Sequence, residues 1–226
     1  MNCELRTLLI DADDTLWENN IYFERATAEF VAALGKRGHS ASRIKELLWE
    51  TEQHNVKTTG YGSNAYSQSL HEVARAFQVT DMEPWIAQRE QELFNHPIDL
   101  MPGVQDTLPL LHARNQVILV SKGVPDEQLG KLKRSGLASY FHKTEIVFEK
   151  DVATYRELLR VHQLQTESTW MIGNSPRSDI NPAKAASLRT VFIPYHTTWW
   201  HEIEEISPNG ETLVLENFGE LAEHFG

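Results

Sequence analysis

The sequence has little of what secreted, membrane and nucleic-acid-binding proteins usually contain. Cys3 is the only cysteine among 226 residues, so the chain cannot form an internal disulfide and is typical of a reducing compartment. The apolar run near the N-terminus is too short for a signal-peptide core or a membrane span. Lysine and arginine total 21 against 32 acidic residues, giving a formal charge of −11. This balance disfavours nucleic-acid and anionic-membrane partners, and we expect a cytoplasmic protein.

What the chain does have is a globular composition with short, branched-aliphatic runs. A content of 41% hydrophobic and 23% charged residues fits one main core with room for a smaller insertion. Apolar runs at 6–10, 117–120, 145–148, 169–172 and 190–193 predict buried parallel strands, and helical patterns lie between them. Strands that alternate with helices predict an α/β protein with a doubly wound parallel sheet of the Rossmann-like kind. Ligands of such sheets bind at the carboxyl ends of the strands.

The region between the first two strands has a different pattern. Residues 18–98 show almost no strand signal and about four helical stripes of apolar residues. An insertion of this length is typical of a lid or a binding element. The sequence therefore predicts a core made of 1–17 and 99–226 and a helical cap over 18–98.

Polar residues stand at the predicted strand ends, and their order resembles the haloacid dehalogenase superfamily of hydrolases. The family's first motif, Asp-x-Asp-x-Thr, matches residues 11–15, and its Ser or Thr at a strand end matches Ser121. Its lysine matches Lys150, and its Gly-Asp-x-x-x-x-Asp motif appears as Gly173-Asn174 followed by Asp179. The resemblance covers essentially the whole chain and is to the phosphatase branch with a helical cap between the first and second motifs.

The resemblance implies a phosphatase mechanism. Asp11 attacks a phosphate monoester to form an aspartyl-phosphate, and Asp13 protonates the leaving alkoxide and then activates water. Ser121 hydrogen-bonds a phosphoryl oxygen, while Lys150 offsets charge near Asp11. The expected substrate is a small phosphorylated metabolite, whose identity the resemblance does not give.

The resemblance also implies Mg²⁺, held by the Asp11 side chain, the Asp13 backbone carbonyl and the fourth motif. Here the chain departs from the family, because Asn174 stands where an aspartate is usual. An amide oxygen can ligate magnesium but brings no negative charge. Whether Asn174 or Asp179 is the main ligand of that motif stays open.

Other residues are candidates for contact with the substrate. Thr15 belongs to the first motif, Lys122 follows Ser121, and Tyr61 stands in a Gly-Tyr-Gly turn between two predicted helices of the insertion. For Lys122 and Arg177 a surface role is an equal alternative, and the turn at Tyr61 can be a plain connection. The segment 193–202 either borders the site or packs its tryptophans against the core.

Each assignment has a structural alternative, and the function has two. An Asp-x-Asp after a strand can be turn or capping chemistry, Ser121 can cap a helix, and Lys150 can be a solvated lysine. A 2-haloacid dehalogenase shares the fold and nucleophile but needs no metal and typically lacks an acid at the position of Asp13. A catalytically weak binding or regulatory protein is suggested by Asn174 alone. The oligomeric state stays open.

Overall fold

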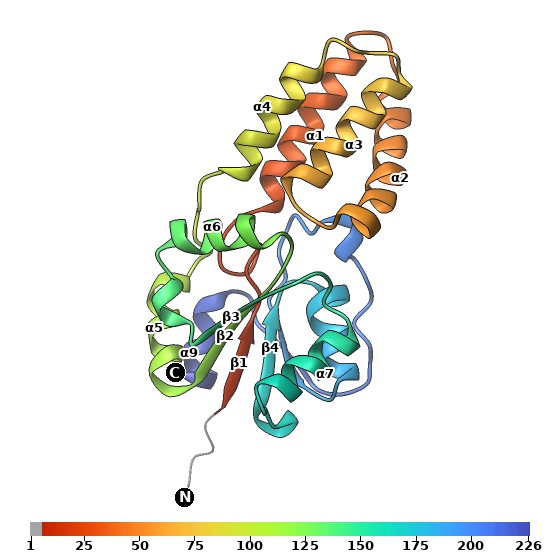
Figure 1. Ribbon diagram of the computed structural model, residues 1–226. Coiled ribbons are helices and arrows are strands. Elements are labelled where there is room, and N and C mark those ends of the chain that lie inside the picture. The colour runs from red at the N-terminus through yellow and green to blue at the C-terminus, as the bar shows by residue number, and fades with distance from the viewer. Residues whose placement is uncertain (1–5) are drawn as a thin grey trace, which may run out of the picture. The chain divides into compact units, whose positions relative to one another are not determined.

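A computed structural model describes residues 6–226, so Cys3 lies outside the described residues. Within this range the chain forms a six-stranded sheet with the order β3-β2-β1-β4-β5-β6, and every neighbouring pair is parallel. Figure 1 labels the first four strands, β1 to β4. The strands are β1 (Thr7–Ile10), β2 (Gln116–Lys122), β3 (Lys143–Val147), β4 (Thr169–Gly173), β5 (Arg189–Phe192) and β6 (Thr212–Val214). The predicted α/β class and parallel sheet are therefore confirmed.

Alternation along the strands gives the sheet two covered faces. Leu8 and Ile10 of β1 pack into one apolar cluster with α5 (Val104–Arg114) and α9 (Leu221–Phe225), whereas Leu9 packs into another with α7 (Val152–Val161) and α8 (Asn181–Ala185). Successive side chains of a strand point to opposite faces, so a strand covered on both sides is apolar throughout. This explains the unbroken run TLLI, which is buried at every position.

The edge strand β6 was not predicted from the sequence. It has only three residues, and its pattern of partly buried and exposed positions lacks the apolar run that marks the inner strands. It pairs with β5 through Thr190, Val191 and Phe192. A strand this short is specified by its partner more than by its own composition.

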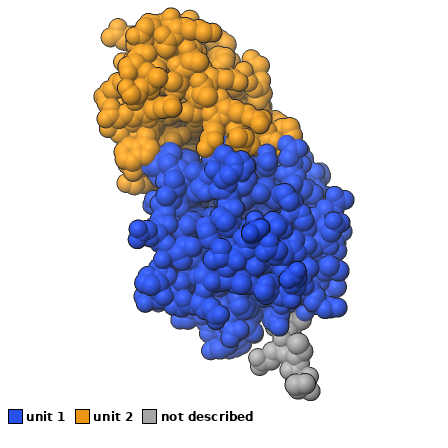
Figure 2. Space-filling view, turned by 180° about the vertical axis from the view of Figure 1, so that it is seen from behind, with its two compact units in different colours: residues 1–20, 98–122, 128–226 blue, residues 21–97, 123–127 orange. Residues whose placement is uncertain are grey.

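The described chain divides into two compact units, coloured separately in Figure 2. Unit 1 consists of residues up to Asn20, 98–122 and 128–226, and it contains the sheet. Unit 2 consists of 21–97 and 123–127. Helix α6 (Pro125–Ser135) has residues in both units.

Unit 2 is helical, as the apolar stripes predict. Its helices are α1 (Asn20–Gly35), α2 (Ala41–Thr59), α3 (Ser63–Ala76) and α4 (Glu83–Phe94). Their buried faces form a cluster of their own around Phe30, Ile44, Leu70 and Ile86. Along residues 6–226 none of the helices is long and apolar enough to cross a membrane.

Candidate active site

The first polar residue after β1 is fixed by the sheet. The Asp11 N–H donates to the Ile172 carbonyl at 2.9 Å, which continues the pairing of β1 with β4 by one residue. Just beyond, the Thr15 and Leu16 N–H groups turn back to the Ala12 carbonyl at 3.3 and 2.8 Å. The Asp11 carboxylate is thereby held at the carboxyl edge of the sheet, where the sequence predicts the site.

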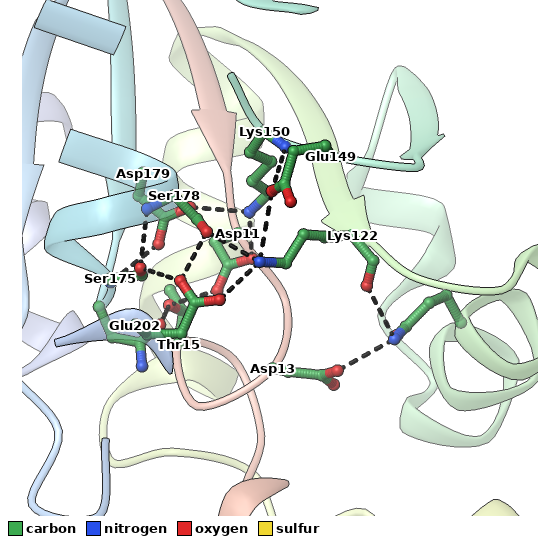
Figure 3. Close-up of polar contacts among 12 residues, drawn as sticks. Asp11, Asp13, Thr15, Lys122, Glu149, Lys150, Ser175, Ser178, Asp179 and Glu202 are labelled. Atoms are coloured by element: carbon green, nitrogen blue, oxygen red, sulfur yellow. Dashed lines mark hydrogen bonds and ion pairs between the residues drawn. The ribbon is translucent and has the colours of Figure 1, made fainter. Parts of the chain in front are cut away.

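Lys150 joins two carboxylates from different strands. Its Nζ donates to Asp11 Oδ1 and, at 2.8 Å, to Asp179 Oδ1, as Figure 3 shows. Lys150 follows β3 and Asp179 follows β4, so the contact exists only in the folded sheet. Both side chains are at most 2% exposed, and an ammonium buried to this degree is stabilised by pairing with both acids.

The charges of this trio change its proton affinities. Burial, followed by the nearby negative charge of Asp179, raises the pKa of Asp11 to about 7 even though Lys150 acts in the opposite direction. Burial alone would lower the pKa of Lys150, but Asp11 and Asp179 outweigh it and raise that pKa above its ordinary value. The lysine is therefore a fixed cation, and one more positive charge near Asp11 would favour its ionised form.

Asp179 is fully engaged by protein groups. Its Oδ1 accepts from Lys150 and its Oδ2 accepts from the Ser175 N–H at 2.9 Å. A Cβ added at Gly173 would lie 2.2 Å from Asp179 Oδ2, so this carboxylate can approach the backbone only because position 173 is glycine. The contact explains why glycine opens the fourth motif.

Thr15 links the first and fourth motifs. Its hydroxyl donates to Asp11 Oδ2 at 2.9 Å and lies 3.3 Å from Asn174 Oδ1. Both oxygens therefore lie within 3.3 Å of the same hydroxyl. The side chain predicted to bind substrate thus orders the nucleophile and the amide in this structure.

Two of the predicted ligand oxygens suit magnesium. Asp11 Oδ2 and Asn174 Oδ1 are hard oxygen donors that both lie within 3.3 Å of the Thr15 hydroxyl. Burial and then the charge of Asp179 raise the Asp11 pKa, and a cation beside Asp11 would offset both effects. No group of three or more His, Cys, Asp or Glu in the described part of the chain has the arrangement of a metal site.

Asp13 is surrounded by donors that the sequence did not indicate. Lys131 Nζ lies 3.0 and 2.9 Å from its two oxygens, Gln128 Nε2 lies 3.0 Å from Oδ2, and Trp17 Nε1 lies 2.8 Å from Oδ1. Burial by itself raises the pKa of Asp13, but the Lys131 ammonium and these hydrogen bonds outweigh it and hold that pKa below its ordinary value. Asp13 is therefore an ionised carboxylate here.

Asp14, the third acid of the first motif, has a local structural role. Its Oδ1 accepts from the N–H groups of Asn19 at 2.8 Å and Asn20 at 3.0 Å, where α1 begins. Its φ of 62° is in the left-handed region, which Asp tolerates better than most residues. Burial, despite these two hydrogen bonds, raises its pKa to about 7.

A second polar cluster contains Lys122 and a residue that sequence reasoning missed. Lys122 Nζ lies 2.5 Å from Glu202 Oε1, 2.9 Å from Ser178 Oγ and 3.5 Å from Glu149 Oε1. Glu202 comes from the segment 193–202, which therefore borders this cluster as well as carrying Trp199 and Trp200. The sequence left open that the stretch IPYHTTWWHE borders the site, but nothing in it singled out Glu202.

The remaining predicted residues lie in different units. Ser121 is buried in β2, opposite Ile146 of β3 in the register. Tyr61 lies in unit 2, in the turn between α2 and α3. The roles assigned to both stay predictions. The structure brings together Asp11, Thr15, Lys150, Asn174 and Asp179, and in a neighbouring cluster Lys122.

Comparison with known proteins gives one consistent group. The model of the haloacid dehalogenase-like hydrolase family matches residues 5–187, which is more than half of the chain. The chain is 25% identical over 227 residues to the Bacillus subtilis protein YfnB, named as a candidate HAD-hydrolase, covering 93% of this chain and 92% of YfnB.

Solved structures show the same similarity. A haloacid dehalogenase-like family hydrolase from Xanthomonas campestris is 27% identical with a TM-score of 0.85, covering 97% of this chain and 90% of that one. YfnB bound to magnesium has a TM-score of 0.68 at 20% identity, with 98% of each chain covered. An L-2-haloacid dehalogenase from Xanthobacter autotrophicus with chloropropionic acid covalently bound has a TM-score of 0.64 at 14% identity, with 97% of each covered.

Proposed function

This chain belongs to the haloacid dehalogenase-like hydrolase family, and we propose that within it the chain is a magnesium-dependent phosphatase for a small phosphorylated metabolite. The observation that carries the proposal is the buried trio of Asp11, Lys150 and Asp179, with a second carboxylate, Asp13, two residues after the first. An anionic nucleophile beside a fixed ammonium suits attack on a phosphate, and the second carboxylate can handle the leaving group's proton.

In the proposed reaction Asp11 is the nucleophile, and Asp13 acts first as the acid and then as the base. An oxygen of Asp11 attacks phosphorus, the bond from phosphorus to the ester oxygen breaks, and the departing alkoxide takes a proton from Asp13. Asp13 then accepts a proton from water, which attacks the aspartyl-phosphate and releases inorganic phosphate and free Asp11. In the structure Asp13 is ionised and surrounded by donors, so before the first step it must loosen its contact with Lys131 and take up a proton from solvent. The proton that it accepts from water in the second step restores this protonated form for the next cycle.

Several residues would hold and orient the reactants. Lys150 and Thr15 keep the Asp11 carboxylate in position through its two oxygens. Ser121 is proposed to donate to a phosphoryl oxygen. The segment 18–98 is proposed to serve as a helical cap, with Tyr61 contributing to the choice of substrate.

Magnesium would be held by Asp11, Asn174 and the Asp13 carbonyl, and when bound it would neutralise phosphoryl charge facing the carboxylates. Asp179 is a weaker candidate ligand than Asp11, because its side chain is only 1% exposed, against 10% for that of Asp11, and Lys150 and the Ser175 N–H cover its oxygens. We propose that Asp179 positions Lys150 and the loop at Ser175. The similarity to magnesium-bound YfnB supports a cation site in this fold.

A second candidate function, 2-haloacid hydrolysis, is favoured by the similarity to the Xanthobacter dehalogenase. Both reactions begin with attack by the Asp11 carboxylate, so the nucleophile does not separate them. Asp13 does, because departure of a halide needs no proton donor, whereas departure of an alkoxide does. The carboxylate at position 13 therefore favours the phosphatase.

The test is a screen of phosphorylated metabolites and 2-haloacids with and without Mg²⁺, using wild type and Asp11→Asn. We expect phosphate release that needs Mg²⁺ and falls by roughly a thousandfold or more in Asp11→Asn. Asp14→Asn is the matched control, since Asp14 is in the same loop but bonds to backbone N–H groups. Halide release without metal would favour the dehalogenase, and no turnover of any compound would favour the binding protein.

A further inference from the structure

The Glu202 carboxylate is held by three donors, one from the end of β2 and two from the turn that follows β4. Lys122 Nζ, at the end of β2, lies 2.5 Å from Glu202 Oε1. Ser178 Oγ lies 2.5 Å from Glu202 Oε2, and the Ser175 hydroxyl also donates to Oε2. An ammonium and two hydroxyls thus converge on one carboxylate, as Figure 3 shows. This is the donor set of a site for an oxyanion.

The cluster is linked directly to the nucleophile trio. The Ser175 N–H donates to Asp179 Oδ2, and Asp179 Oδ1 accepts from Lys150, which binds Asp11. Ser178 precedes Asp179 in the chain. A substrate anion bound by Lys122, Ser175 and Ser178 would therefore be next to the residues that hold the nucleophile.

Glu202 reaches this cluster through its own side chain. The backbone around it is tied elsewhere: Arg177 Nη1 donates to the His201 carbonyl at 3.0 Å, and Asn181 Nδ2 donates to the Glu205 carbonyl at 2.9 Å. Glutamate has three rotatable side-chain bonds, so its carboxylate can leave the cluster while these backbone contacts persist. The side chain is 13% exposed, which leaves part of it open to solvent.

We propose that Lys122, Ser175 and Ser178 form a binding site for an anionic group of the substrate, and that the Glu202 carboxylate occupies this site until the substrate displaces it. The anion is either the phosphoryl group or a second acidic group of a phosphorylated compound, and this assignment rests on the proposed phosphatase function. An ionised Glu202 carboxylate can take the place of the substrate anion. Burial alone would raise the pKa of Glu202, but Lys122 and the two serines lower it to about 2.

Direct binding of inorganic phosphate tests this without turnover. Isothermal titration calorimetry compares wild type with Glu202→Gln, which keeps the size of the side chain but removes the competing charge. We expect Glu202→Gln to bind phosphate about tenfold more tightly, and Lys122→Met in that background to abolish the gain. Glu202→Ala should also bind more tightly, so the result does not depend on one variant folding.

The control is Glu204→Gln, which removes an exposed carboxylate two residues away and should leave phosphate affinity unchanged. If Glu204→Gln bound phosphate as much more tightly as Glu202→Gln does, the cause would be the lower net negative charge of the protein, and the proposal would be overturned. Unchanged or weaker phosphate binding in Glu202→Gln and Glu202→Ala would also overturn it, because Glu202 would then be holding Lys122 in place for the anion.

Kinetics separate this proposal from the phosphatase itself and identify the group bound. If Glu202→Gln binds phosphate more tightly but the protein hydrolyses no ester, the anion site is supported and the phosphatase function is wrong. If the protein is an active phosphatase but Glu202→Gln binds phosphate no more tightly, the phosphatase function is supported and the anion site is wrong. If the site takes the phosphoryl group, Glu202→Gln lowers KM for p-nitrophenyl phosphate and for a phosphoglycerate. If it takes a second acid, only the phosphoglycerate KM falls, and a rise in both contradicts the site.

Discussion

Lys131 binds both oxygens of Asp13, at 3.0 and 2.9 Å, and also donates to Asn19 Oδ1 at 2.7 Å. The lysine side chain is 1% exposed, while that of Asp13 is 22% exposed. An ammonium this deeply buried is stabilised by its hydrogen bonds to an anion and an amide oxygen. The proposed acid of the reaction is thus also a structural partner of α6.

The first prediction concerns the stability of this pair. Lys131→Met leaves the Asp13 carboxylate without its cation, and the free energy of unfolding at pH 7 should fall by roughly 1–3 kcal/mol, discounted for the partial exposure of Asp13. Adding Asp13→Asn removes the stranded charge, so the double variant should recover part of the loss. Urea unfolding of both single variants and the double variant measures the coupling.

Lys133→Met is the control, because Lys133 is exposed on the same helix and should change stability little. The coupling should also depend on pH. Since the folded-state pKa of Asp13 lies below its ordinary value, the stabilisation is complete above the ordinary value and is lost as pH falls through the lowered one. A cycle with additive effects at pH 7 would show that the contact contributes nothing to folding.

The sequence was sufficient to predict that Asp11, Lys150 and Asn174 would meet. Asp11 and Asn174 each follow a run of buried apolar residues, and neighbouring parallel strands bring such positions to one edge of the sheet. Lys150 follows the half-buried strand β3 and was assigned from the family resemblance. Lys131 and Glu202 gave no comparable signal. In QLGKLKRSG a lysine looks like any solvated helix residue, and its burial depends on Asp13, which is over a hundred positions away. Such contacts are decided by tertiary packing.

The second prediction concerns Asp14 and stability. Its folded-state pKa of about 7 is above the ordinary 3.8, so the folded chain binds a proton more tightly than the unfolded chain between these values. The free energy of unfolding should therefore decrease as pH rises from about 4 to 7, and at the upper end this loss amounts to roughly 4 kcal/mol. Asp14→Asn should remove this contribution, so its stability relative to wild type should grow with pH.

Denaturant unfolding of the two proteins at several pH values measures that difference. Asn keeps an oxygen for the N–H groups of Asn19 and Asn20 and tolerates the positive φ. Asp14→Ala is the control, since it loses the acceptor and should be less stable than Asp14→Asn at every pH. A constant difference between wild type and Asp14→Asn would mean that Asp14 has an ordinary pKa.

The third prediction concerns Asn174 as a ligand. Asn174→Asp adds a negative charge beside Asp11 and should lower the Mg²⁺ concentration for half-maximal binding, whereas Asn174→Ala removes an oxygen donor and should raise it by about tenfold. Asp179→Asn should affect metal binding less than Asn174→Ala does, because the Asp179 side chain is only 1% exposed and is covered by Lys150 and the Ser175 N–H. Calorimetric Mg²⁺ titrations compare the variants. A larger effect of Asp179→Asn would make Asp179 the main ligand.

The last prediction is a pH dependence of magnesium binding. Without a cation, burial and Asp179 raise the pKa of Asp11 to about 7, so below that pH a proton competes with the metal for the same carboxylate. The apparent Kd for Mg²⁺ should be about tenfold higher at pH 6 than at pH 8, and it should level off above pH 7. Calorimetry at both values tests this independently of turnover. Asp14→Asn supplies the control, since Asp14 also has a pKa of about 7 but donates no oxygen to the proposed site. If that variant lost the pH dependence, Asp14 would be the titrating group; if wild type bound Mg²⁺ equally at both pH values, Asp11 would not be a ligand that a proton can block.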